Sequence, residues 1–435
     1  FMKIVIDDPT FLGVNEAALA LSEASLSSTE LVESSLSKIK TEGKELNAFI
    51  HVESELSKKE AALSDARRRK GTLLSPLDGV PIAVKDNIDV LGQPTTNGLG
   101  TQWLPSQDAH IVKILRNKGM VFIGKTNMHE AALGATTDNP HHGKCINPKI
   151  YSHTPGGSSG GSGSAVAAYL CPAALGTDTM GSVRVPAAYC GIVGFKPTQH
   201  FWDTVGVTPL STTLDTIGPL ARSVADIAVM TDVPLKSLNN RDFSLAVLDN
   251  FDSADMQEEI RSVYEQTKNL IQSSNVVIET TGLVDYEPSQ ARRWGLLISE
   301  VEASVLLGDL LIRSPKAFSD ELQSMLAFGT RSSASRYFEA LQQINSIKNR
   351  FLTILEKVKF VISPTTPQTS FLFSDETPVN QADFTALANF CGCPAISLPI
   401  KHQAGKKPMG LQIMAAPGKD VELLSVASFI EGIVT

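Results

Sequence analysis

Hydrophobic residues along this chain follow two periods, one typical of helices and one typical of buried strands, and segments of the two kinds alternate. Ser27 and Glu30 form a capping box, which predicts a helix with apolar residues at helical spacing after it. Short apolar runs at 80–84 and 120–123 predict buried strands, and a helix beginning at Asp108 is expected between them. This alternation predicts an α/β fold with a central mixed β-sheet between helical layers.

The same alternation continues to the end of the chain. Helices are predicted at 160–170, 223–230, 256–271, 289–308 and 331–357, and strands at 175–177, 244–248, 360–362, 395–400 and 410–414. We expect residues 1–435 to form a single domain, because large α/β enzymes often build one continuous core of this length. Residues 235–350 are expected to form a helical layer or cap.

The composition is ordinary for a soluble globular protein. The apolar fraction is 42%, the charged fraction is 19%, and no segment approaches the roughly 18 uninterrupted apolar residues of a membrane span. The net charge is −8 and the longest basic run is Arg67 to Lys70, which argues against nucleic acid or a membrane as partner. Asp7, Asp8 and Glu16 do not fit a signal peptide, so a cytoplasmic location is expected.

Cysteine and histidine spacing gives no support for a disulfide framework or a metal site. The five cysteines include no C-x-x-C pair, and the eight histidines include no H-E-x-x-H motif. We therefore expect no metal.

Two Gly/Ser-rich clusters, at 156–164 and 176–182, are the most informative segments of the sequence. The run between them, 165–175, is apolar, as expected for buried structure and not for a flexible linker. Glycines in such a setting let backbone N–H groups and small hydroxyls approach a ligand closely.

Two short motifs in this part of the chain do not carry the chemistry that they suggest. Residues 119–126 match the phosphate-loop pattern G-x-x-x-x-G-K-[ST], but the residues between the two glycines are themselves predicted to be a strand. Residues 156–161 match G-x-S-x-G, but a loop precedes them where a nucleophile elbow requires a strand. His200 and His402 lie downstream, but neither has a persuasive acidic partner, so a Ser-His-Asp triad is weakly supported.

A set of motifs spread over nearly the whole chain resembles the amidase signature family in order and spacing. The segments that carry the resemblance are Val84-Lys85-Asp86-Asn87, 156–161, 176–179, 181–184 and 194–198, with further similarity at 211–219, 362–365 and 394–410. The resemblance is weakest from 235 to 350. It implies the amidase signature fold and an amidohydrolase that uses no cofactor.

By this resemblance, Ser182 is the nucleophile, Ser158 is a bridging serine on a cis peptide, and Lys85 is the base. A serine hydroxyl is a poor nucleophile until a neighbouring group takes its proton. A lysine can take that proton only when it is neutral, so burial must lower its pKa from about 10.4. The apolar strand before Lys85 is consistent with such burial.

The resemblance also implies an oxyanion hole made by backbone N–H groups, those of Thr179, Met180, Gly181 and Ser182. Met180 departs from the family, in which glycine is commonest at this position. A side chain there either narrows the substrate pocket or changes the loop, so the substrate range is what this departure leaves open.

Other residues of the motifs receive supporting or substrate-binding roles. Ser159 and Asp178 are expected to support the catalytic loops. Arg184 is expected to pair with Asp178 as a brace, and its alternative role is to bind a substrate carboxylate. Candidate substrate-binding residues are also found in segments that line the pocket in relatives or follow the second Gly/Ser cluster: Trp103, Phe201, Trp202, Thr213 and Asp215. Each of these has a structural alternative.

The predicted function is hydrolysis of a carboxylic amide to an acid and an amine or ammonia through an acyl-enzyme on Ser182. Three alternatives stay open: a glutamine-hydrolysing subunit of an amidotransferase complex, a hydrolase of biuret-like or allophanate-like urea derivatives, and a non-catalytic binding module with an amidase-like fold. The expected partner is a small-molecule amide. The apolar N-terminal helices are compatible with a homodimer.

Overall fold

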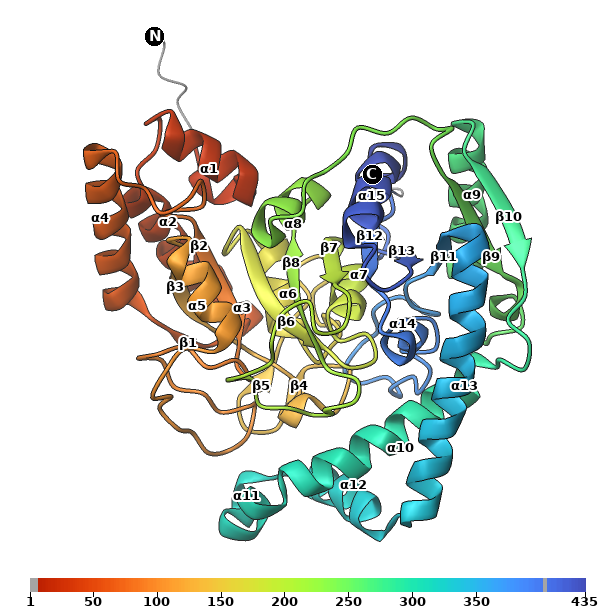
Figure 1. Ribbon diagram of the computed structural model, residues 1–435. Coiled ribbons are helices and arrows are strands. Elements are labelled where there is room, and N and C mark those ends of the chain that lie inside the picture. The colour runs from red at the N-terminus through yellow and green to blue at the C-terminus, as the bar shows by residue number, and fades with distance from the viewer. Residues whose placement is uncertain (1–6, 402–404) are drawn as a thin grey trace.

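The fold is built on a mixed β-sheet that runs through the whole molecule (Figure 1). The structure is a computed structural model that describes residues 7–401 and 405–435. In this part of the chain the main sheet has 11 strands, in the order β1 (Phe49–Val52), β3 (Val121–Thr126), β2 (Pro81–Lys85), β6 (Ala173–Asp178), β8 (Thr216–Ala221), β7 (Val193–Lys196), β12 (Ala395–Pro399), β13 (Gly410–Ala415), β11 (Phe360–Pro364), β9 (Ser244–Leu248) and β10 (Val277–Thr281). Strand β2 is parallel to both of its neighbours, β3 and β6, whereas β6 and β8 are antiparallel.

Helices cover both faces of this sheet because successive strand residues point to opposite sides. In β2, Ile82 and Val84 join one buried cluster and Ala83 joins another. The first face packs against α1 (Val14–Ser22), α5 (His110–Asn117), α8 (Val224–Thr231), α9 (Glu258–Ser273) and α15 (Asp420–Val434). The second face packs against α2 (Ser28–Thr41), α4 (Ser54–Lys70), α6 (Gly160–Ala167), α7 (Arg184–Cys190), α13 (Ala334–Val358) and α14 (Ala386–Cys391).

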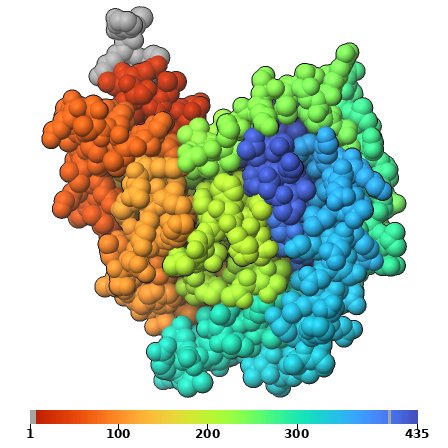
Figure 2. All heavy atoms as spheres, viewed as in Figure 1, coloured from red at the N-terminus to blue at the C-terminus, as the bar shows by residue number. Residues whose placement is uncertain are grey.

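A further layer of helices lies below the sheet in the view of Figure 1. It consists of α10 (Pro288–Leu306), α11 (Gly308–Arg313) and α12 (Asp320–Arg331), and α10 packs against α12, α13 and α14. Leu99 and Met128, from loops that follow β2 and β3, share a buried cluster with Ala303 of α10 and Leu322 of α12. In Figure 2 these helices, coloured cyan, lie directly below the yellow-green residues at the middle of the face.

The structure confirms the predicted α/β fold with a mixed central sheet between helical layers. The capping box of Ser27 and Glu30 is present, and residues 121–126 form strand β3, so the phosphate-loop match lacks its loop. The sequence did not predict strands β7, β8 and β10 or helices α7, α11, α12, α14 and α15. Strand β8 contains Gly218 and Pro219 and is buried on both faces, so it shows no alternation.

None of the helices in the described ranges combines the length and apolar character that crossing a membrane requires.

Candidate active site

Parallel strands β2 and β6 bring Lys85 to the candidate site. Because parallel neighbours end at the same edge of a sheet, Lys85, the last residue of β2, meets Thr177 near the end of β6. The Lys85 Nζ atom donates to Thr177 Oγ1 at 2.8 Å and to Ser158 Oγ at 2.7 Å. Asn87 Nδ2 also donates to Thr177 Oγ1, at 3.1 Å. Thr177 and Asn87 had received no role from the sequence, although both lie within the motif segments.

Ser158 belongs to the first Gly/Ser cluster, which passes against neighbouring backbone at the start of α6. The Gly157–Ser158 peptide bond is cis, and the Ser158 carbonyl accepts a hydrogen bond from the His129 N–H at 3.0 Å. A Cβ atom on Gly161 would lie 2.3 Å from the Asn127 carbonyl oxygen, so only glycine permits this close packing. The cluster therefore holds Ser158 against the Lys85 amine.

Ser182 lies in the turn that connects β6 to α7, and a backbone hydrogen bond joins it to Ser159, the residue after Ser158. The N–H of Ser159 donates to the Ser182 carbonyl at 3.2 Å, and Ser159 Oγ donates to the Thr177 carbonyl at 3.1 Å. Ser159 thus ties the Ser158 loop to both ends of the Ser182 loop. The Ser182 side chain is half-buried, and within the described ranges its hydroxyl has no hydrogen-bond partner. This leaves the Ser182 oxygen available to an incoming group.

The turn before Ser182 presents a series of backbone donors. None of the N–H groups of Thr179, Met180, Gly181 and Ser182 donates to another residue in the described part of the chain. Val183, the next residue, donates its N–H to Asp178 Oδ2 at 3.2 Å. Four consecutive free donors beside a serine hydroxyl can stabilise a developing oxyanion.

The Met180 side chain lies between this turn and helix α10. It is half-buried, and a Cβ atom on Gly295 of α10 would lie 2.5 Å from Met180 Sδ and 2.7 Å from Phe390 Cε1. The Met180 carbonyl accepts a hydrogen bond from Thr385 Oγ1 at 2.5 Å. The absence of a side chain at Gly295 therefore makes room for the methionine.

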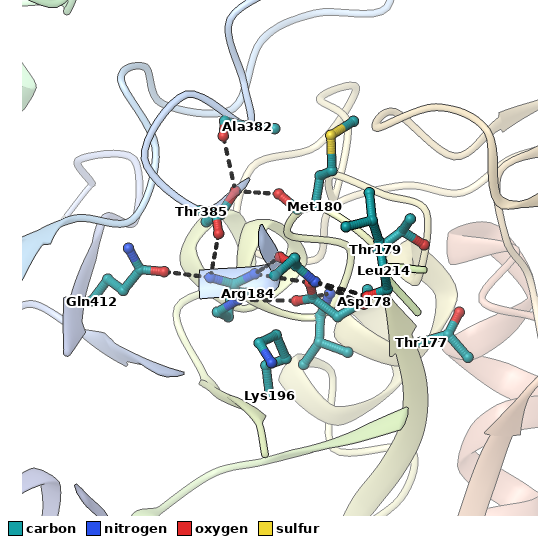
Figure 3. Close-up of polar contacts among 12 residues, drawn as sticks. Thr177, Asp178, Thr179, Met180, Arg184, Lys196, Leu214, Ala382, Thr385 and Gln412 are labelled. Atoms are coloured by element: carbon teal, nitrogen blue, oxygen red, sulfur yellow. Dashed lines mark hydrogen bonds and ion pairs between the residues drawn. The ribbon is translucent and has the colours of Figure 1, made fainter. Parts of the chain in front are cut away.

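Arg184 braces the turn from below through a saturated set of hydrogen bonds (Figure 3). Its Nε and Nη2 atoms donate to the two carboxylate oxygens of Asp178, and the remaining donors reach the Thr385 carbonyl, Gln412 Oε1 and Asn389 Oδ1. All five N–H groups of the guanidinium are thus engaged, and the side chain is fully buried. This geometry favours the bracing role over binding of a substrate carboxylate.

The charges around the site are set by burial. Burial lowers the pKa of Lys85 to about 7, and the charges of Asp215 and Asp178 act in the opposite direction. Burial alone would raise the pKa of Asp178, but the charge and hydrogen bonds of Arg184 outweigh it and lower the pKa to about 2. The site therefore contains a permanent buried anion paired with Arg184 and an amine that loses its proton near neutral pH.

Asp215 connects the turn to the loop of residues 210–215. Its Oδ1 atom accepts from Thr179 Oγ1 at 2.6 Å, and its Oδ2 atom accepts from the N–H groups of Leu210 and Ser211 at 2.9 and 3.1 Å. Burial raises the pKa of Asp215 to about 6, although these hydrogen bonds and the Lys85 charge lower it. Both carboxylate oxygens thus have protein partners, which favours a structural role.

Among the described residues, none of the three predicted aromatic residues shares a hydrogen bond or a ring contact with Lys85 or Ser158. Phe201 and Trp202 are half-buried, contact each other with ring centroids 5.2 Å apart, and pack against the cluster on the α1, α8 and α15 face of the sheet. Trp103 is also half-buried and pairs with Thr95 through backbone hydrogen bonds. Substrate contact by these three residues stays a prediction.

The histidine, cysteine and carboxylate side chains give no indication of a metal centre. Across residues 7–401 and 405–435, no three of them lie together in a group that could hold a metal ion.

Comparisons with known proteins identify the family to which this chain belongs. A family model described as Amidase matches residues 30–424. The chain belongs to the amidase family. It is therefore an enzyme of the amide hydrolase class, as the sequence motifs implied.

Individual relatives cover almost the whole chain. The A subunit of glutamyl-tRNA(Gln) amidotransferase from Acidothermus cellulolyticus is 32% identical over 96% of this chain and 93% of its own length. A crystal structure of an amidase is 29% identical, covers 98% of this chain and 100% of its own, and has a TM-score of 0.92. A structure of a vestigial protein complex that "reveals the evolutionary origins of an s-triazine catabolic enzyme" is 27% identical over 97% of this chain and 99% of its own, with a TM-score of 0.90.

We predict that Arg184→Met destabilises the protein by about 3–5 kcal/mol, because it leaves the buried Asp178 carboxylate without its partner. Urea unfolding monitored by circular dichroism measures the change. Arg350→Met is the matched control, since the Arg350–Asp285 pair is exposed and should contribute less than about 1 kcal/mol. Equal losses of unfolding free energy in the two variants would show that Arg184 stabilises the protein no more than an exposed ion pair does.

Proposed function

We propose that this chain hydrolyses a carboxylic amide through an acyl-enzyme on Ser182, with Ser158 as the proton relay and Lys85 as the base. The observation that carries the proposal is the buried Lys85 amine, which contacts the Ser158 hydroxyl at 2.7 Å in the loop that adjoins Ser182. Because the pKa of Lys85 is about 7, much of this amine is neutral near neutral pH and can accept a proton.

In acylation, the Ser182 oxygen attacks the amide carbonyl carbon and its proton passes to Ser158, while the Ser158 proton passes to Lys85 Nζ. The carbonyl oxygen becomes an oxyanion, for which the free N–H groups from Thr179 to Ser182 are the donors. Each such donor contributes about 2.7–4 kcal/mol to the transition state. Collapse breaks the C–N bond, and the leaving nitrogen takes a proton back through Ser158. In deacylation, water attacks the ester carbonyl carbon and its proton passes through Ser158 to Lys85. The acid then leaves, and the Ser182 oxygen takes a proton back through Ser158.

A second candidate function is glutamine hydrolysis within an amidotransferase complex. The 32% identity to the A subunit of an amidotransferase, over 96% of this chain, favours it. An isolated chain that hydrolyses simple amides supports the amidase. A chain that is active on glutamine only with a co-purifying partner in size-exclusion chromatography supports the amidotransferase component. The biuret-like substrates, the homodimer and the cytoplasmic location stay predictions.

Ser182→Ala should reduce kcat by about 10⁴-fold or more, because the acyl-enzyme can no longer form. The melting temperature should stay close to that of the wild type, since the lost hydroxyl has no hydrogen-bond partner among the described residues. Turnover of a chromogenic amide measures the rate, and mass spectrometry of the wild type after acid quench should detect an acyl adduct on the peptide that contains Ser182. Retained hydrolysis by the variant would rule out Ser182 as the nucleophile.

The rate should also depend on pH through Lys85. As pH falls below about 7 the base becomes protonated, so kcat/KM should fall about tenfold per pH unit. Asp215 raises the pKa of Lys85 through its charge, so Asp215→Asn should move this acid limb to lower pH. A pH–rate profile of both proteins tests the assignment. A limb that moves to higher pH in the variant would contradict it.

Met180 and Gly295 should control the substrate size that the site accepts. Met180→Gly removes the side chain between α10 and the turn of residues 179–182, which we call the oxyanion turn. The value of kcat/KM for bulky amides should therefore rise about tenfold relative to small ones. Gly295→Ala presses on Met180 Sδ and should shift the preference the opposite way. A panel of aliphatic and aryl amides measures both. Unchanged preference in both variants would show that Met180 does not line the site.

A further inference from the structure

Glu302 of helix α10 holds the loop that contacts the oxyanion turn. Its carboxylate accepts hydrogen bonds from Ser211 Oγ at 2.6 Å, from the Thr213 N–H at 3.1 Å, and from the Thr213 hydroxyl. From the helical side, Tyr337 of α13 donates its hydroxyl to Glu302 Oε1 at 2.8 Å. All of these groups donate and Glu302 only accepts, which is a pattern that an ionised carboxylate satisfies.

Burial of the Glu302 carboxylate costs folding free energy. Glu302 is only 9% exposed, and within the described ranges no lysine, arginine or histidine forms an ion pair with it. Burying an anion without a cation costs free energy that hydrogen bonds only offset, whereas an apolar residue would pack α10 against its neighbours at less cost. A role beyond the packing of helices therefore accounts better for the acid.

The contacts of Glu302 continue toward the oxyanion turn without a break. Ser211, which donates to Glu302 through its side chain, donates its N–H to Asp215 Oδ2 at 3.1 Å. Asp215 Oδ1 in turn accepts from Thr179 Oγ1 at 2.6 Å. Thr179 is the first residue of the turn with free N–H groups. Glu302 is thus connected to that turn by three successive hydrogen bonds through one short loop.

We infer that Glu302 is a positioning residue of the active site, which fixes loop 210–215 against α10 and thereby sets the geometry of the Thr179–Ser182 turn. The inference rests on the proposed function, because the turn matters only if it stabilises an oxyanion. It assigns a part in the reaction to α10, a helix in the region where the family motifs are weakest. Glu302 itself touches no reacting atom.

Glu302→Gln is the direct test. Glutamine replaces one accepting oxygen of Glu302 with an NH2 group, which faces groups that already donate. Loop 210–215 should therefore loosen, and kcat should fall about tenfold or more. KM should change less than kcat, because the turn acts mainly on the transition state. Glu300→Gln is the matched control: it lies on the same helix, makes no hydrogen bond to loop 210–215 among the described residues, and should keep near wild-type kcat.

A double-mutant cycle separates positioning from general stability. Thr179→Val breaks the link between Asp215 and the turn, so if Glu302 acts through that link, adding Glu302→Gln to Thr179→Val should lower kcat by less than twofold further. Multiplied effects of the two changes, or a normal kcat in Glu302→Gln, would overturn the inference. If Glu302→Gln does not fold, the Thr213→Val variant takes its place in the double-mutant cycle, because it removes one donor to Glu302. The same criteria then apply.

The wild type and Ser182→Ala distinguish this inference from the proposed function. A wild type without amide hydrolysis, or one unaffected by Ser182→Ala, refutes the proposed function. An active wild type that depends on Ser182 but shows a normal kcat in Glu302→Gln refutes only the role of Glu302.

Discussion

The proposed active site of this protein depends on keeping one amine away from water. Lys85 ends a strand that is buried along its whole length, and its Nζ atom is surrounded by hydroxyl groups instead of solvent. An ammonium ion in this position loses most of its hydration, and for that reason the pKa of Lys85 falls to about 7. Two nearby carboxylates, Asp178 and Asp215, limit the fall. Without the negative charges of these two residues, the pKa of Lys85 would fall further.

The surrounding structure keeps those charges and loops in place. Arg184 neutralises Asp178 with two of its donors and gives the others to Thr385, Asn389 and Gln412, which joins the turn of residues 179–182 to α14 and β13. The glycines of the first Gly/Ser cluster let Ser158 approach Lys85, because any side chain at Gly161 would collide with backbone. The helical layer supports the other side through α10. Strands therefore place the proposed base, Lys85, and loops braced by helices place Ser158 and Ser182.

Much of this arrangement could be predicted from the sequence, because it depends on local signals. Short apolar runs located β2, β9 and β11, and the motif segments predicted Lys85, Ser158 and Ser182 as one group. The pairing of Asp178 with Arg184 was also expected, since the two residues are close in sequence. Glycine spacing indicated where backbone approaches backbone.

The remaining features depend on contacts between residues that are distant in sequence. Glu302 lies 89 residues after Thr213, in a segment with no recognisable motif, so nothing in its neighbourhood indicates a contact with the catalytic loop. The pairing of Met180 with Gly295 is equally remote. Phe201 and Trp202 lie close to the motifs in sequence, yet their rings pack on the opposite face of the sheet. Sequence proximity could not determine the face on which these rings lie.

The most direct test of this account is a titration of the Lys85 amine itself. Protein labelled with ¹³C and ¹⁵N at lysine side chains, with Lys85→Met for assignment, gives the protonation of Nζ as a function of pH by NMR. Burial of Lys85 predicts a midpoint near pH 7, far below that of exposed lysines. A midpoint in the ordinary range near 10.4 would mean that Lys85 is charged at neutral pH and cannot be the base.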